Sequence, residues 1–105
     1  NSSDIFFKQL KIAKNVYFIK GLLPNLKPAM SIKLFGSFAN GENSRDSDID
    51  IVVIANKDFQ VNSYKGHVVQ LHTYTPAQWS KAKQDNAAFV NEVMKGILIY
   101  GEEPG

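Results

Sequence analysis

The chain has 105 residues, of which 44% are hydrophobic, and its formal net charge is +2. This length builds one domain with one core, which buries roughly two-thirds of the surface of the unfolded chain. The absence of Cys excludes disulfides and thiolate zinc sites and fits a reducing compartment, the cytoplasm.

Membrane and secretion signals are missing from the sequence. No apolar run approaches the ~20 residues that span a bilayer. The first residues, NSSDIFF, lack the basic start and the long apolar stretch of a signal peptide. We therefore expect a cytoplasmic protein with no membrane contact. The lysines are spread along the chain, which favours solvated faces over a nucleic-acid-binding surface.

Residues 4–20 are predicted to form a packing helix with a broad apolar stripe. Ser3 or Asp4 is its candidate N-cap and Gly21 its candidate end. Pro24 and Pro28 then predict an extended connection, because proline and the residue before it both resist helix. The stripe residues follow helical spacing: Phe6, Leu10, Ala13 and Tyr17, broadened by Ile5, Ile12, Val16 and Ile19.

Three strands are expected to form the core sheet, at residues 31–35, 49–54 and 67–74. The third has the alternation and β-branched content of a strand. Residues 55–65 show no clear period, and they leave room only for a loop and a short edge strand.

The last third of the sequence predicts a helix and a final strand. Thr75 is a candidate N-cap, Pro76 suits the first turn and Gln78 completes a capping box. An irregularity is expected at residues 85–86, and Gly96 is the candidate C-terminal cap. Residues 97–100 then form a short strand, and no internal repeat or second domain is visible.

Residues 36–54, GSFANGENSRDSDIDIVVI, carry the chemistry. A strand sends alternate side chains to one face, so Asp48 and Asp50 point the same way while Ile49 turns into the core. Two adjacent carboxylates repel each other unless a cation lies between them. Hard oxygen ligands of this kind suit Mg²⁺, which takes the rest of its coordination shell from water and substrate phosphate.

The Gly-Ser corner before these acids is a candidate phosphate site. Gly36 lets the backbone turn and approach a ligand closely. The amides of Ser37 to Ala39 open a short helix and form an anion site, with the Ser37 hydroxyl as a further donor.

The combination of these features is more specific than either part. An Asp-x-Asp alone is commonly a solvated strand end, and a lone Gly-Ser is a turn. Here the Gly-Ser corner follows an apolar strand, and the acids open a second one. The stretch resembles the nucleotidyltransferase superfamily, whose signature is Gly-Ser, about ten residues, then Asp-x-Asp and an apolar strand. Within it the chain looks like a minimal nucleotidyltransferase, over residues 32–100.

The resemblance implies an α/β (α+β) fold, with a mixed sheet backed by helices in a single domain over residues 1–105. It also implies transfer of a nucleoside monophosphate, from ATP or another nucleoside triphosphate, with pyrophosphate leaving. Asp48 and Asp50 would hold Mg²⁺ against the triphosphate. Gly36 and Ser37 would hold its terminal phosphates.

Two further residues of the signature have open roles. Arg45 is a candidate phosphate ligand, with a solvated loop position as the alternative. We expect Ser47 to cap or orient the turn that leads into the strand, in preference to contacting the substrate.

The family's third carboxylate is missing from its expected place. Alignment through the third strand, HVVQLHTY, puts Gln70 at that position and His72 two residues further on the same face. Gln can coordinate through its carbonyl but cannot act as a base, so metal binding and acceptor activation should weaken. His72 could replace the base at neutral pH, or it could be only a histidine near a strand end. His67 and Trp79 favour structural roles, at a strand start and in the core.

Two classes of function follow from the resemblance. The first is an active enzyme that pairs as antitoxin with an all-helical HEPN-type toxin, adding AMP to that protein. The second is a nucleotide-binding or partner-masking module weakened by the lost carboxylate. Small-molecule transfer is disfavoured, since such relatives carry an additional acceptor domain. The sequence leaves the oligomeric state of the protein open.

Overall fold

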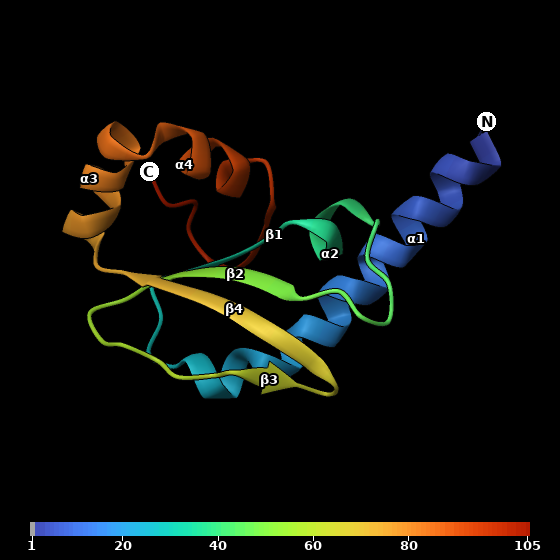
Figure 1. Cartoon of the computed structure of the whole chain (residues 1–105), viewed down its shortest axis with the longest axis horizontal. Helices are drawn as coiled ribbons and strands as arrows, with labels where there is room; N and C mark the ends of the chain where they lie inside the picture. The colour runs from blue at the N-terminus through green and yellow to red at the C-terminus, as the bar shows by residue number, and fades with distance from the viewer. Residues whose placement is uncertain (1) are drawn as a thin grey trace.

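The fold is a five-stranded mixed sheet with helices on both faces (Figure 1), which confirms the predicted fold class. The computed structural model describes residues 2–105 of the chain, and residue 1 lies outside the described residues. The elements are α1 (Ser2–Ile19), the 3-10 helix η1 (Lys20–Leu26), β1 (Ser31–Phe35), α2 (Ser37–Asn40), β2 (Ile49–Ile54), β3 (Ser63–Tyr64), β4 (His67–Tyr74), α3 (Pro76–Asp85), α4 (Ala87–Met94) and β5 (Ile97–Gly101).

The sheet order is β3-β4-β2-β1-β5. The pair β2 and β4 is parallel, whereas β1 runs antiparallel to both β2 and β5. The end of β1 therefore meets the starts of β2 and β4 at one end of the sheet. There the register pairs Phe35 with Asp50, and Asp50 with Gln70.

Both faces of the sheet are covered, which is why β2 is almost continuously apolar. The prediction of one core was wrong, because alternate side chains of β2 enter two cores, one on each face of the sheet. On the α1 side lie Ile49, Ile51 and Val53, and on the α3 and α4 side lie Val52 and Ile54. Trp79 is buried in the second core, as a core anchor should be.

The capping box that was predicted for α3 is present. The Thr75 side chain accepts a hydrogen bond from the Gln78 amide, and the Gln78 side chain accepts one from the Thr75 amide. The expected irregularity is a break at Asn86 that separates α3 from α4.

The end of α4 differs from the prediction. Lys95, in a helical conformation, is the C-cap of α4, so the cap assigned to Gly96 was wrong. Gly96 is needed for another reason, since a Cβ there would lie 2.1 Å from the Leu34 carbonyl oxygen.

The connection after α1 differs from the extended segment that the prolines predicted. The chain instead continues as the 3-10 helix η1, with Pro24 inside it, and only the residues after Leu26 leave the helical conformation. Gly21 does not end the helical segment. A Cβ at Gly21 would lie 2.0 Å from the Tyr64 hydroxyl oxygen, so the glycine makes room for that side chain.

Helix α1 presents a different face to the core than the sequence predicted. The helix already includes Ser2, so Ser3 and Asp4 lie within its first turn and do not cap it. The predicted packing stripe is exposed: Phe6, Leu10, Ala13 and Tyr17. The side that packs on the sheet lies opposite these four residues. It contains Asn15 and Phe18 together with Val16 and Ile19, two residues of the broadened stripe for which the prediction is confirmed. Helix α1 is therefore apolar on two sides, and periodicity alone could not rank them.

Among residues 2–105, no helix combines the length and apolarity needed to cross a membrane.

Candidate active site

The two signature acids stand where β2 begins, at the end of the sheet that also carries α2 (Figure 1). Asp48 directly precedes the strand, and Asp50 is its second residue. Both side chains are half-buried, whereas Ile49 between them is fully buried. Strand alternation thus holds the two carboxylates on the α3 and α4 side of the sheet, as the sequence predicted.

The Gly36 corner lies directly against Asp50. Gly36 has φ 72° and ψ −153°, a conformation that is essentially restricted to glycine. A Cβ built on Gly36 would lie 2.3 Å from Oδ2 of Asp50. Glycine is therefore required at this position for two reasons: its backbone conformation and the close approach of the Asp50 carboxylate.

Helix α2 starts at Ser37, immediately after this corner. The amides of Ala39 and Asn40 both donate to the Gly36 carbonyl, at 3.0 and 3.2 Å. The amide of Ala39, which was predicted to belong to an anion site, is thus engaged within the turn. The amides of Ser37 and Phe38 precede the first helical hydrogen bond, so they are the backbone donors of the corner.

The pKa of the Asp50 carboxyl lies above its ordinary value. Burial is the main cause, and the neighbouring Asp48 carboxylate adds to it, while His72 acts in the opposite direction. Within residues 2–105, no Lys or Arg forms an ion pair with either acid. Apart from the effect of His72 on Asp50, residues 2–105 thus leave the negative charge of the two carboxylates unbalanced.

Gln70 links the two acids. It pairs with Asp50 in the β2–β4 register, and its Nε2 donates to Oδ2 of Asp48 at 3.1 Å. The amide nitrogen is therefore committed to Asp48, which leaves the Gln70 carbonyl oxygen as the coordinating atom of this side chain.

His72 lies two residues beyond Gln70 on the same face of β4. Its ring contacts those of Phe35 and Phe89, with centroid distances of 6.0 and 5.1 Å. The histidine is half-buried in this aromatic group, close enough to Asp50 to lower the pKa of its carboxyl. The packing supports the structural role that was left open for His72.

The loop before Asp48 is closed by its serines. The Ser44 amide donates to the Ser47 hydroxyl at 2.8 Å, and the Ser47 amide donates to the Ser44 carbonyl at 3.2 Å. Ser47 thus caps this turn. Arg45 is exposed within it and lines a hollow on the α1 side, together with Lys11 and Lys14. That side of the sheet is not the one that carries the carboxylates.

His67 has a larger role here than its place at a strand start indicated. Its Nδ1 lies 2.8 Å from the Ser47 carbonyl oxygen, next to Asp48 in the chain. Its ring packs edge-on against Phe18 and Phe38, with centroid distances of 6.0 and 5.1 Å. His67 therefore positions the entry to β2. No local pattern in the sequence signals this contact, which joins residues 20 positions apart.

The donor set suits a hard divalent cation that is completed by a substrate. Asp48 and Asp50 offer carboxylate oxygens, and Gln70 offers a neutral one. In the part of the chain that the structure describes, no group of three or more His, Cys, Asp or Glu could hold a metal ion. Two carboxylates are the number with which Mg²⁺ is held when substrate phosphates supply further ligands.

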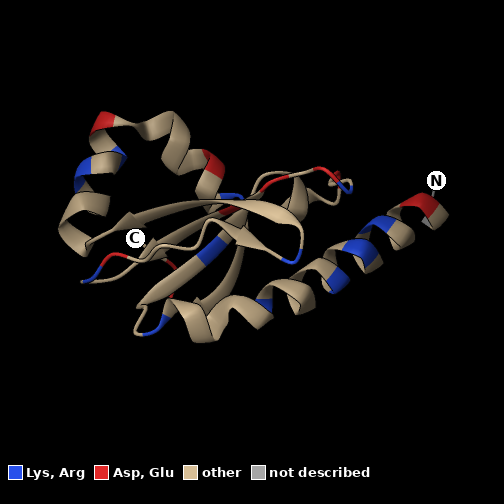
Figure 2. Ribbon diagram, turned by 60° about the horizontal axis from the view of Figure 1, so that its bottom comes forward, with Lys and Arg blue, Asp and Glu red and all other residues tan. Residues whose placement is uncertain are grey.

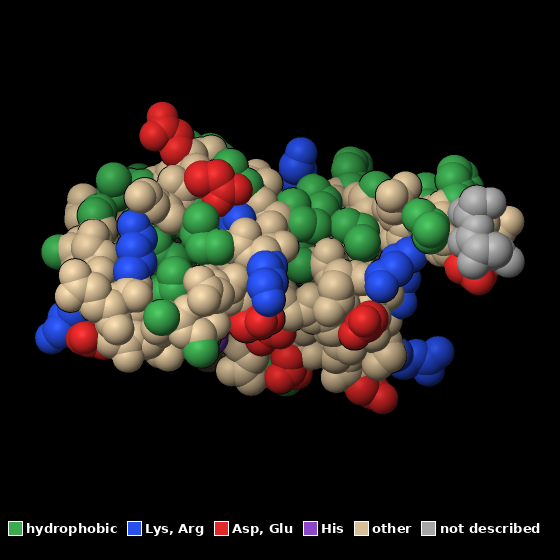
Figure 3. Space-filling model, turned by 90° about the horizontal axis from the view of Figure 1, so that it is seen from above, with side chains coloured by type: hydrophobic (Ala, Val, Ile, Leu, Met, Phe, Trp, Pro, Cys, Tyr) green, Lys and Arg blue, Asp and Glu red, His purple; other side chains and the backbone are tan. Residues whose placement is uncertain are grey.

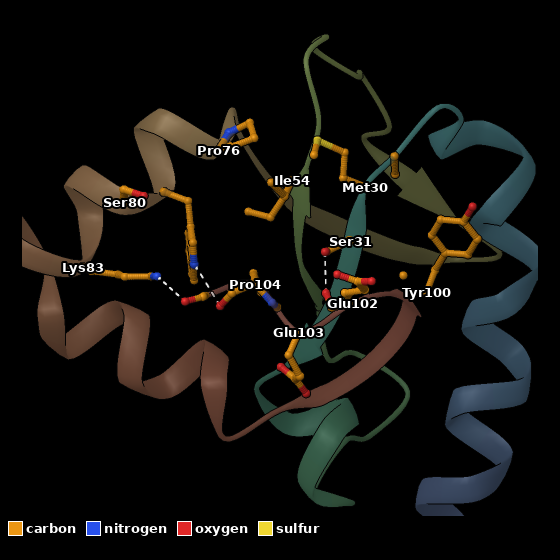
Figure 4. Close-up of a pocket in the computed structure, with 14 residues that line it drawn as sticks. Met30, Ser31, Ile54, Pro76, Ser80, Lys83, Tyr100, Glu102, Glu103 and Pro104 are labelled. Atoms are coloured by element: carbon orange, nitrogen blue, oxygen red, sulfur yellow. Dashed lines mark hydrogen bonds between the residues drawn. The ribbon is translucent and has the colours of Figure 1, made fainter.

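A cavity of about 570 Å³ lies at the opposite end of the sheet (Figure 4). It is lined by Ser31 and Ile54, where β1 begins and β2 ends, and by the C-terminal segment, residues 102–105. That segment is held by hydrogen bonds from Ser31 to the Glu102 carbonyl and from Trp79 to the Pro104 carbonyl. None of the predicted site residues lines this cavity.

Comparison with known proteins agrees with the signature. Residues 17–98 match the family model described as the nucleotidyltransferase domain. Over 61 residues the chain is 41% identical to a Methanocaldococcus jannaschii protein that carries the provisional name protein adenylyltransferase. The match covers 58% of this chain and 47% of that relative, so the chain spans about half the relative's length. No solved structure is significantly similar to the chain.

The matched range includes the Gly36 corner, both signature acids and Gln70. It also covers well over half of the chain, and the fold that carries these residues is the predicted one. The chain therefore belongs to the nucleotidyltransferase domain family.

Proposed function

We propose that the protein transfers AMP from ATP to a hydroxyl group of a partner protein. The observation that carries this proposal is the contact between Gly36 and Asp50, which brings a candidate phosphate corner against an unbalanced carboxylate pair. In the reaction, the acceptor oxygen bonds to the α-phosphorus of ATP and the bond to pyrophosphate breaks. The acceptor proton leaves to a base.

Each residue of the corner has a defined task in this proposal. The amides of Ser37 and Phe38, with the Ser37 hydroxyl, bind the terminal phosphates. Asp48 and Asp50 hold Mg²⁺, which when bound neutralises phosphate charge and stabilises the leaving pyrophosphate. Gln70 keeps Asp48 oriented through its amide. Arg45 is the weaker phosphate candidate, because it lines a hollow on the other side of the sheet.

We assign the acceptor to a HEPN-type protein, with the present chain as the antitoxin of the pair. The support is the resemblance to minimal nucleotidyltransferases and the name of the archaeal relative, which refers to a protein acceptor. We expect this pair to act in the cytoplasm.

A second candidate function rests on Gln70. A neutral amide in place of the third carboxylate cannot accept the acceptor proton. The chain would then bind nucleotide and mask its partner with little or no transfer. In that case Gln70→Asp should convert a weak enzyme into a stronger one.

One experiment tests both candidates. Radiolabelled ATP, Mg²⁺ and the HEPN-type protein from the same genome are incubated with wild type, Asp48→Asn or Gln70→Asp. We expect slow labelling of the partner by wild type and none by Asp48→Asn. Gln70→Asp should accelerate labelling by about 10²-fold or more, since the loss of a general base costs about 10²- to 10⁴-fold.

Other outcomes would change the assignment. A wild type already as fast as Gln70→Asp, with labelling lost in His72→Ala, would make His72 the base. Labelling by no variant, with a tight complex retained, would favour the masking module. Labelling that survives Asp48→Asn unchanged would refute the proposed site.

A further inference from the structure

The outer side of α1 is apolar and uncovered. We call Phe6, Leu10, Ala13 and Tyr17 the outer stripe; its three large side chains are 60%, 41% and 84% exposed. The side of the helix that packs on the sheet lies opposite. Ile5 and Phe7, beside the stripe, are also more than half exposed. Contiguous exposed apolar side chains of this kind on one element mark an interaction surface.

The exposed part of α1 projects from the active-site end of the sheet (Figure 1). Asn15 anchors the helix to α2, because its Nδ2 donates to the Phe38 carbonyl at 3.0 Å. One turn earlier, Lys11 Nζ donates to the Asn43 carbonyl in the loop that leads to Asp48. The residues before Lys11 extend beyond these anchors. A molecule bound to them would therefore lie at the same end of the protein as the two acids, and would reach the acids around that end, because α1 and the carboxylates lie on opposite faces of the sheet.

The charges of α1 restrict what can cover it. Lys8, Lys11 and Lys14 follow at three-residue spacing, and Asp4 is the only acid of the helix (Figure 2). Lys14 borders the outer stripe, since it lies four residues after Leu10 and three before Tyr17. Lys8 and Lys11 lie on the side of the loop, against Gly41 and the Asn43 carbonyl. Pairing with a second copy of α1 would offer Lys14 no acid other than Asp4. Figure 3 shows hydrophobic side chains along one edge of the projecting end and cationic side chains beside them.

We propose that the outer stripe is the docking surface for the protein acceptor. The acceptor offers an apolar groove for Phe6, Leu10 and Tyr17, with an Asp or Glu side chain on the rim that meets Lys14. This inference rests on the proposed function for the identity of the acceptor. It adds where that protein binds, and why its acceptor hydroxyl is held at the end of the sheet that carries Asp48 and Asp50.

The test compares matched variants of exposed residues. Titration calorimetry measures the affinity of the HEPN-type protein for wild type, Phe6→Ser/Leu10→Ser, Tyr17→Ser and Lys14→Glu. Tyr100→Ser is the control, because Tyr100 on β5 is also 50% exposed but does not belong to the outer stripe. We expect the stripe variants to weaken binding at least about tenfold, as loss of aromatic anchors does. Lys14→Glu should also weaken it, and Tyr100→Ser should not.

Parallel readouts separate this inference from the proposed function. Circular dichroism and ATP binding report whether each variant keeps its fold and its nucleotide site. If the stripe variants keep wild-type affinity while Asp48→Asn stops labelling, the docking surface is wrong and the function stands. If no variant labels the partner but the stripe variants lose binding, the docking surface stands and the transfer proposal fails.

Three further results would overturn the docking surface. One is the absence of binding between wild type and the HEPN-type protein. Another is a wild-type dimer in light scattering that Phe6→Ser/Leu10→Ser converts to a monomer, since a second copy would then occupy the stripe. The third is sedimentation with phosphatidylserine vesicles that the same variant abolishes, since a lipid surface would then be the ligand.

Discussion

Two charged side chains on the same side of the sheet, Lys33 and Asp50, have opposite kinds of charged neighbour. Lys33 of β1 is 1% exposed, and Glu103 lies 2.9 Å from its ammonium. The carbonyls of Met94 and Gly96 accept from it at 3.4 Å. Asp50 lies nearer the other end of the sheet. The charged side chain with the largest effect on its pKa is a second carboxylate, Asp48.

The difference separates a structural charge from a reactive one. A buried charge is tolerated when a counter-charge and hydrogen bonds replace the lost water. The chain supplies Lys33 with a carboxylate from its C-terminal segment and with two carbonyls from the end of α4. It supplies a like charge to Asp50, which costs stability and is relieved when a cation binds. Uncompensated charge of this kind is typical of sites that await a ligand.

The largest expected effect on stability comes from removing Glu103, the counter-charge of the buried Lys33. Glu103→Ala leaves the Lys33 ammonium buried without its carboxylate, and we expect it to lower the free energy of unfolding by about 3 kcal/mol. This is the low end for broken buried pairs, because the Glu103 side chain is 55% exposed. Lys33→Met removes the charge and keeps the volume, so it should cost less. Urea unfolding of both variants measures the difference, and a larger loss in Lys33→Met would break the comparison.

An intermediate effect is expected from crowding Asp50. Gly36→Ala forces a non-glycine residue to φ 72° and places its Cβ 2.3 Å from the Asp50 carboxylate. Gly66→Ala is the matched control, since Gly66 has φ 88° with no atom within 4 Å of the added Cβ. We expect about 1 kcal/mol for Gly66→Ala and about 2 kcal/mol for Gly36→Ala.

The same pair of variants has a functional readout. Only Gly36→Ala should weaken binding of ATP with Mg²⁺ in calorimetry. Equal losses of stability and unchanged ATP binding in both variants would show that the contact between Gly36 and Asp50 is not needed for the site.

The smallest expected effect concerns pH. Because the pKa of Asp50 is raised in the folded state, the folded protein binds more protons than the unfolded one, and stability falls as pH rises through that pKa. Asp50→Asn should therefore raise Tm in metal-free buffer at pH 7. The gain should vanish in acid, where the wild-type carboxyl is protonated in both states. Thermal melts of Asp50→Asn and the exposed control Asp58→Asn from pH 3 to 8 check this sign.

The elements with local signals were predicted well. The capping box at Thr75, the four consecutive apolar residues of β2 and the Gly-Ser corner depend on neighbouring residues, so each could be identified in isolation. The predictions that were wrong concern glycines whose role is set by a residue distant in the sequence. Gly96 was assigned a cap, whereas the Leu34 carbonyl requires it, and Gly21 was assigned a helix end, whereas Tyr64 requires it.

The sequence by itself determined the fold class and the family, because hydrophobic periodicity, turn chemistry and the spacing from Gly36 to Asp50 are all properties of the local chain. Tertiary structure alone decided which of two apolar sides of α1 is buried, since both have helical spacing and only the position of the sheet distinguishes them. It also decided that His67 supports the loop before Asp48, and that Lys33 is neutralised by Glu103, 70 residues away. Contacts of that kind depend on chain packing, which no local pattern encodes.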